Sequence, residues 1–216
     1  GKVLRILEQA EMLCQRYHVV VANPPYMAHR GMNSKLRVFM QDSYKPFKSD
    51  LFAAFISRGA TLSLKGGRMG YMSPNVWMFI LSHEDLRRHL LNVQRLDCLV
   101  ELPLTGFTGA TVQICAFCFS NCSDRDTRAS FIQLTDFRGA ELMAEKTLEA
   151  VSNPNCGWHF KVSSRELEEL PRSPLAYWVS DKFRKSFGNA KSLGALAQPV
   201  LGMTSSDNNR FLRRWF

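Results

Sequence analysis

The hydrophobic positions of residues 1–22 change from helical to extended spacing. Apolar residues recur every three or four positions over residues 2–17, which predicts an amphipathic helix. The run His18-Val19-Val20-Val21-Ala22 comes next, and consecutive β-branched residues of this kind are typical of a buried strand. The pattern therefore predicts one helix–strand step of an α/β fold.

The alternation of helices and strands continues along the chain. We predict a helix from Ser34 to before Pro46, and a second helix that is capped by Ser49 or Asp50 and stops at Gly66-Gly67. A strand at 68–73 comes next, followed by a helix that opens at Ser82 with Asp85 in an imperfect capping box. Two further strands are predicted at 96–102 and 112–120. Beyond residue 121 we predict a strand at 129–134 and helices at 139–151, 164–170 and 175–187.

A rigid polar turn, Asn23-Pro24-Pro25-Tyr26, directly follows the strand at 18–22. Open α/β sheets bind their ligands at the carboxyl ends of strands. The side-chain oxygen of Asn23 and the backbone carbonyl of Pro24 can both accept hydrogen bonds from an amino group, and consecutive prolines fix the backbone around them. Tyr26 offers an aromatic face for a base. An ordinary Asn-Pro turn is the alternative, but the position behind a buried strand favours a site for methyl transfer to an amine.

Several segments resemble one enzyme family. Val19-Val20-Val21-Ala22-Asn23-Pro24-Pro25-Tyr26 resembles the catalytic motif of adenine-N6 DNA methyltransferases, although His18 stands where the family usually has Asp. The similarity is greatest to the PglX-like methyltransferases of BREX and phage-growth-limitation systems, and to restriction-modification methyltransferases. The further matching segments are 49–55, 64–75, 107–112 and 202–212.

The resemblance implies a fold. It implies an α/β chain with a partial class I (Rossmann-like) S-adenosylmethionine methyltransferase sheet that contains strands four to seven. The last two of these strands would pair antiparallel. An α-rich C-terminal extension would follow the sheet. Residues 1–150 would be the C-terminal half of the catalytic domain, and 151–216 a connector toward a target-recognition domain. The family's glycine-rich cofactor turn is absent before Asn23. We therefore expect a fragment of a longer enzyme, inactive when isolated, with the strand at 18–22 at a sheet edge.

The resemblance also implies a function and site residues. The function is site-specific methylation of the N6 amine of adenine by S-adenosylmethionine, in a phage-defence or restriction-modification system. Asn23, Pro24, Pro25 and Tyr26 would be catalytic, Tyr26 and Phe107 would stack on a base flipped out of double-stranded DNA, and Asn23 would touch the edge of the cofactor site. Other subunits of a defence system are possible partners. Methylation of a protein glutamine or an RNA base, and a non-catalytic DNA-binding remnant, remain as alternatives.

Composition and charge agree with a nucleic-acid partner. The 216 residues are 45% hydrophobic, which is enough for a core, and the net charge of +9 favours a polyanion, although a solvated basic surface is equally compatible with it. No segment is long and apolar enough to cross a membrane, and the six cysteines form no secreted framework, so we expect a cytoplasmic protein. The Cys115-x-x-Cys118-x-x-x-Cys122 spacing is assigned to the core, and no metal site is predicted. No Pro-Cys pair is present, which argues against cytosine-C5 methylation.

Overall fold

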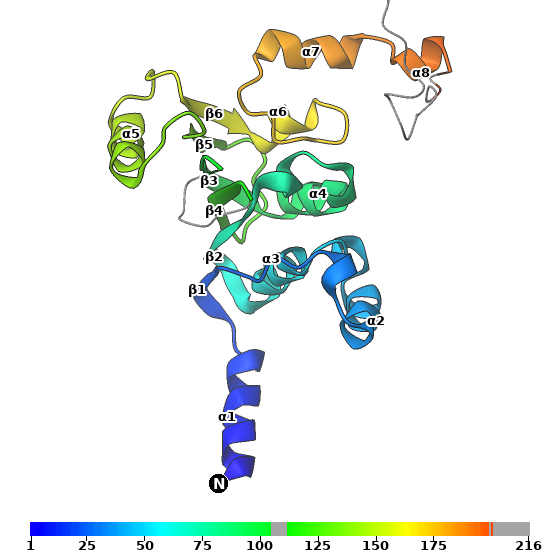
Figure 1. Ribbon diagram of the computed structural model, residues 1–216, viewed down its shortest axis with the longest axis vertical. Coiled ribbons are helices and arrows are strands. Elements are labelled where there is room, and N and C mark those ends of the chain that lie inside the picture. Colours follow the sequence, from blue (N-terminus) through cyan, green and yellow to red (C-terminus); the bar gives the residue numbers. More distant parts are fainter. Residues whose placement is uncertain (105–111, 199, 201–216) are drawn as a thin grey trace, which may run out of the picture.

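A mixed β-sheet organises the chain (Figure 1). The computed structural model describes residues 1–104, 112–198 and 200. Within these residues the sheet has six strands in the order β1-β2-β4-β3-β5-β6. Their bounds are β1 Tyr17–Ala22, β2 Ser63–Pro74, β3 Arg95–Glu101, β4 Ile114–Ser120, β5 Arg128–Gln133 and β6 His159–Ser163.

The strand directions bring three strand ends to one edge of the sheet. β1 is parallel to β2, and β4 is antiparallel to both β2 and β3. The carboxyl ends of β1, β2 and β3 therefore lie at the same edge. The predicted antiparallel pairing of the last two methyltransferase-type strands is confirmed by β3 and β4. The expectation for the strand at 18–22 is also confirmed, because β1 pairs only with β2 among the described residues.

Helices lie on both faces of this sheet. Helices α3 (Leu51–Leu62), α4 (Glu84–Val93) and α6 (Ser164–Glu168) pack against the main core, which includes Met69, Phe117 and Phe131. Helix α5 (Ala140–Ser152) packs on a second cluster with Ile132 and Leu134. The other helices are α1 Lys2–Cys14, α2 Ser34–Ser43, α7 Asp181–Asn189 and α8 Leu193–Leu196. Figure 1 shows α1 projecting away from the sheet, and none of its side chains is buried.

Helix α3 approaches the sheet closely because of a glycine. A Cβ atom at Gly59 would overlap the hydroxyl group of Tyr71 on β2. Tyr71 is buried there, and burial raises the pKa of its phenol to about 12. The side chains of Phe52, Ala53 and Ile56 are fully buried on the same helix. α3 is thus a fixed element of the core, close to β1 and β2.

Stability should fall in mild acid because of His83, which precedes α4. Its side chain is 4% exposed, and burial, followed by the charge of Arg87, lowers its pKa to about 4. The unfolded chain therefore binds a proton near pH 6.5 that the folded protein binds only near pH 4. We expect a loss of about 3 kcal/mol of stability between these pH values, at about 1.4 kcal/mol per pKa unit. Denaturant titrations across this range test it, and a His83→Gln variant with the same slope would contradict it.

The predicted end of the second helix at Gly66-Gly67 is wrong. Helix α3 ends at Leu62, and Ser63 is its C-terminal cap. The glycines lie inside β2, where Gly66 has φ +77° and its N–H donates to the carbonyl of Asn121 at 2.8 Å. A glycine is needed at this φ because an L side chain is strained there.

The predicted cap at Ser82 is wrong as well. Ser82 lies in the 3₁₀ turn Leu81–His83, and α4 begins at Glu84 without a side-chain cap. The carbonyl of Ser82 instead accepts a hydrogen bond from the hydroxyl of Ser49 at 2.9 Å.

Residues 175–180 are not helical, in contrast to the prediction of a helix over 175–187. Helix α7 begins only at Asp181, after the cap Ser180. The N–H of Leu175 donates to the carbonyl of Met78 at 2.9 Å, which holds this segment against the turn that follows β2. Strand β6 was not predicted, and it pairs antiparallel with β5.

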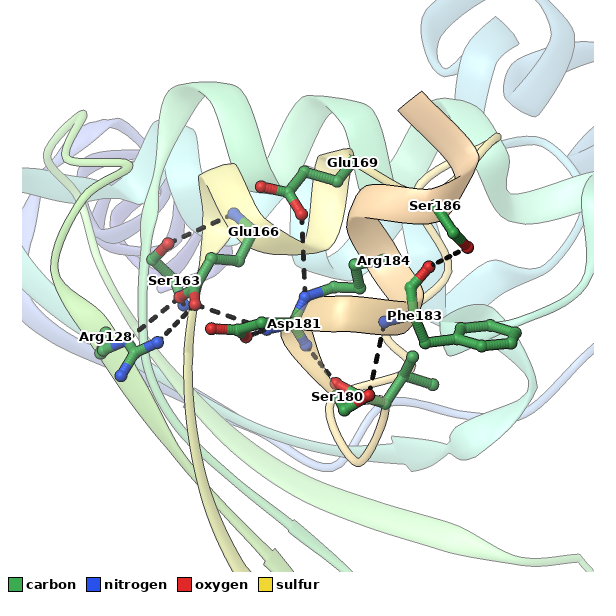
Figure 2. Close-up of polar contacts among 10 residues, drawn as sticks. Arg128, Ser163, Glu166, Glu169, Ser180, Asp181, Phe183, Arg184 and Ser186 are labelled. Atoms are coloured by element: carbon green, nitrogen blue, oxygen red, sulfur yellow. Dashed lines mark hydrogen bonds and ion pairs between the residues drawn. The ribbon is translucent and has the colours of Figure 1, made fainter. Parts of the chain in front are cut away.

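A buried arginine joins α7 to the sheet (Figure 2). Arg184 of α7 contacts the carboxylates of Asp181, Glu166 and Glu169, and its side chain is only 3% exposed. Glu166 also pairs with Arg128 of β5 and accepts from the backbone N–H of Ser163 at 2.7 Å. Burial raises the pKa of Glu166, but the hydrogen bonds from Arg128 and Ser163 outweigh it and lower the value to about 2. This charged joint links β5, β6, α6 and α7.

Candidate active site

The Asn-Pro-Pro-Tyr turn lies on the surface at the carboxyl end of β1. Asn23 is exposed, Pro24 is buried, and Tyr26 is 40% exposed, so its ring is accessible from outside. The Tyr26 hydroxyl donates a hydrogen bond to Oδ1 of Asn23 at 3.0 Å. Partial burial, with a smaller contribution from Cys115, raises the pKa of this hydroxyl, which keeps it a donor at neutral pH.

The hydrogen bond from Tyr26 orients the amide of Asn23. It places the amide oxygen, and not the amide nitrogen, on the side of the aromatic ring. A carbonyl oxygen has two lone pairs, so Asn23 Oδ1 can accept a second hydrogen bond from an incoming amine. The sequence prediction that Asn23 and Tyr26 act together is therefore geometrically possible.

An apolar groove of about 420 Å³ begins at Asn23 and crosses the face of β2, β4 and β3. This face of the sheet is opposite to the one that α3 and α4 cover. The lining residues are Val21, Ala22, Asn23, Gly70, Tyr71, Met72, Cys98, Val100, Ala116, Phe117 and Cys118.

The residues that line the groove do not make a complete site for S-adenosylmethionine. None of its lining residues is a carboxylate that could bind the ribose hydroxyls, and Asn23 is its only polar group at a strand end. The lining residues thus do not fit the cofactor as a whole, and the edge contact of Asn23 stays a prediction.

A buried carboxylate organises the same edge of the sheet at the end of β3. Glu101 is 4% exposed and accepts hydrogen bonds from Asn75 at 2.8 Å, Gln113 at 3.1 Å and the Tyr177 hydroxyl at 2.6 Å. The sequence analysis missed this cluster. Its only local signal is the Glu that ends β3.

Some predicted residues lie outside the described part of the chain. Phe107, the predicted second stacking residue, is among them, as is the segment 202–212. Within the described residues no group of three or more His, Cys, Asp or Glu side chains is arranged to hold a metal. Cys115 is buried as expected, whereas Cys118 is exposed in the groove, so the assignment of all three cysteines to the core is wrong.

Comparison with known proteins shows which family this part of the chain resembles. Residues 7–107, which carry the turn and strands β1 to β3, match the Eco57I restriction-modification methylase family. The chain is also 33% identical over its whole length to the adenine-specific methyltransferase BrxX of Escherichia coli O9:H4 (strain HS). It is 28% identical over 97% of its length to the adenine-specific methyltransferase PglX of Lacticaseibacillus casei (strain Zhang).

The relatives are much longer than the chain. The 216 residues span 18% of the length of BrxX and 18% of PglX. Among solved structures, the type I restriction-modification methyltransferase subunit from Streptococcus thermophilus matches with a TM-score of 0.54 and 21% identity. The match covers 74% of this chain and 37% of that subunit, and it supports the methyltransferase-type α/β fold. No helix in the described residues has the length and apolar character needed to span a membrane.

Proposed function

We propose that the natural full-length protein containing this chain is a site-specific DNA methyltransferase. It transfers a methyl group from S-adenosylmethionine to the N6 amine of adenine, within a phage-defence or restriction-modification system. The observation that carries this proposal is the exposed Asn23 amide oxygen beside the accessible Tyr26 ring at the end of a parallel strand. The family match of residues 7–107 supports it.

The turn has the groups that this reaction needs. The lone pair of an exocyclic amine is delocalised into the purine ring, so the nitrogen is a weak nucleophile. Oδ1 of Asn23 and the carbonyl of Pro24 would accept the two amine hydrogens and favour a tetrahedral nitrogen. Acceptors fixed in advance need little reorganisation during the reaction. The Tyr26 ring would stack on the flipped base, an interaction of about 1–3 kcal/mol.

The segment after the turn supports a nucleic-acid substrate. Residues 27–48 contain five cationic side chains and a single acidic one, Asp42. None of the five forms an ion pair within the part of the chain that the structure describes. Cations without acidic partners close to a base-binding turn suit phosphate contacts. They are Arg30, Lys35, Arg37, Lys45 and Lys48.

Further parts of the proposal concern the whole protein. We propose double-stranded DNA with a flipped adenine as the substrate and other defence-system subunits as partners. We also propose a location in the cytoplasm. Residues 1–150 would belong to the catalytic domain and 151–216 would lead to target recognition, with Phe107 as a second stacking residue.

The proposal is tested by identifying the methylated product. The full-length protein is incubated with labelled S-adenosylmethionine and, in parallel, with duplex DNA, structured RNA and a glutamine-containing protein substrate. We expect label in DNA, and mass spectrometry of the nucleosides should identify N6-methyladenine. Label in RNA or in glutamine, with none in DNA, would overturn the proposal in favour of the other amine substrates.

A further inference from the structure

Asp50 connects the catalytic turn to helix α3. Its Oδ1 accepts a hydrogen bond from the backbone N–H of Met27 at 3.0 Å and another from the N–H of Phe52 at 3.3 Å. The second bond caps α3, and the first reaches the residue directly after Tyr26. One carboxylate oxygen therefore holds two elements that are distant in the sequence.

Backbone hydrogen bonds extend this connection on both sides of Asp50. The N–H of Leu51 donates to the carbonyl of Met27 at 3.0 Å, and the N–H of His29 donates to the carbonyl of Ser49 at 3.0 Å. Ala28 and Asp50 form an isolated antiparallel bridge. Residues 27–29 thus run as a short antiparallel pair with residues 49–51.

The turn needs such an anchor because it contains two prolines. Pro24 and Pro25 have no N–H groups, so they cannot donate backbone hydrogen bonds. Met27 is the first residue after the prolines whose backbone N–H donates a described hydrogen bond. α3 is in turn fixed to the sheet through buried Phe52 and Ile56. The Asp50 carboxylate, together with the backbone bond between Leu51 and Met27, therefore links Tyr26 to the core.

We infer that Asp50 is a positioning residue for methyl transfer: through Met27 it holds Tyr26 and Asn23 in the geometry that receives the target base. The inference rests on the proposed function. Misplacement of reacting groups by about 1 Å can cost about 100-fold in rate. Asp50 does not touch the base itself, and it acts through the backbone of the turn.

The test compares Asp50→Ala with Asp50→Asn in the full-length protein. The Asn side chain keeps an oxygen that can accept from Met27 and Phe52, whereas Ala removes it. We expect Asp50→Ala to lower kcat for adenine methylation about 10–100-fold. KM for S-adenosylmethionine should stay within about twofold, and Asp50→Asn should restore kcat to within about threefold, since both N–H groups are again paired.

A matched control separates positioning from loss of a helix cap. Ser180 caps α7, where its hydroxyl accepts from the N–H of Phe183 at 3.4 Å. Ser180→Ala removes a cap of the same kind far from the turn, so it should lower the melting temperature modestly and leave kcat unchanged. Hydrogen–deuterium exchange provides a second readout, because the Met27 amide should exchange faster in Asp50→Ala and not in Asp50→Asn.

Each outcome decides between the possible roles. A wild-type kcat in Asp50→Ala would overturn the inference and leave the proposed function intact. So would an equal loss in Asp50→Asn and Asp50→Ala, because the charge and not the acceptor would then matter. If the wild-type protein methylates no adenine, the proposed function fails, and unchanged Met27 exchange in Asp50→Ala would separately overturn the anchoring role.

Discussion

Replacing Asn23 by alanine in the full-length protein is expected to lower kcat for adenine methylation about 100- to 1,000-fold, the usual loss when one preorganised hydrogen-bonding group is removed from the reacting centre. The alanine cannot accept the amine hydrogens, so the nitrogen keeps its planar, weakly nucleophilic form. Folding should be unaffected, because Asn23 is exposed and its side chain contacts only Tyr26 by a described hydrogen bond.

Radiolabel transfer to duplex DNA measures this loss, and thermal melting verifies the fold. Asn92→Ala is the matched control, since Asn92 is also an exposed asparagine and its amide donates only to the carbonyl of Arg88 in α4. Asn92→Ala should keep wild-type kcat. Undiminished methylation by Asn23→Ala would exclude Asn23 from the chemistry.

The largest effect on stability is expected for Arg87→Ala. Arg87 is 1% exposed on α4, and its guanidinium donates to four backbone carbonyls: Trp77 and Ile80 at 2.8 Å, and Arg172 and Ser173 at 3.1 Å. Alanine would leave these acceptors buried and unpaired, and it would also open a cavity. We expect a loss of about 3–5 kcal/mol, a large part of the roughly 5–15 kcal/mol that stabilises a typical domain.

Arg88→Ala is the natural control for this variant. Arg88 is the next residue of the same helix and is exposed, so its replacement should change stability by less than about 0.5 kcal/mol. Denaturant unfolding and limited proteolysis would compare the two. Equal stabilities of the two variants would show that the four carbonyls are satisfied without Arg87.

The sequence was sufficient for the part of the fold that holds the turn. The valine run predicts β1, and the prolines predict its sharp end, because both signals are local. The edge position of β1 was also predicted, and within the described residues β1 pairs only with β2. The exposed position of Asn23 and Tyr26 agrees with this part of the analysis.

The remaining features depend on contacts between distant residues. Residues 175–180 have a helical pattern, but Tyr177 bonds to Glu101 and Leu175 bonds to Met78, and these contacts hold the segment in a turn instead of a helix. The role of Asp50 shows the same limit. Its capping of α3 was predictable from its position, whereas its bond to Met27 was not, because nothing near Asp50 in the sequence points to the turn.

The charged joint around Arg184 provides a stable reference point for measurements in acid. Since Glu166 keeps its negative charge down to about pH 2, its ion pairs with Arg128 and Arg184 persist at pH values where His83 already becomes protonated. A fluorescent label attached to α7 would therefore keep its place relative to β5 and β6 while the region around α4 responds. With a second label near α4, changes in energy transfer between the two labels would then report movement near α4 and the turn beyond β2.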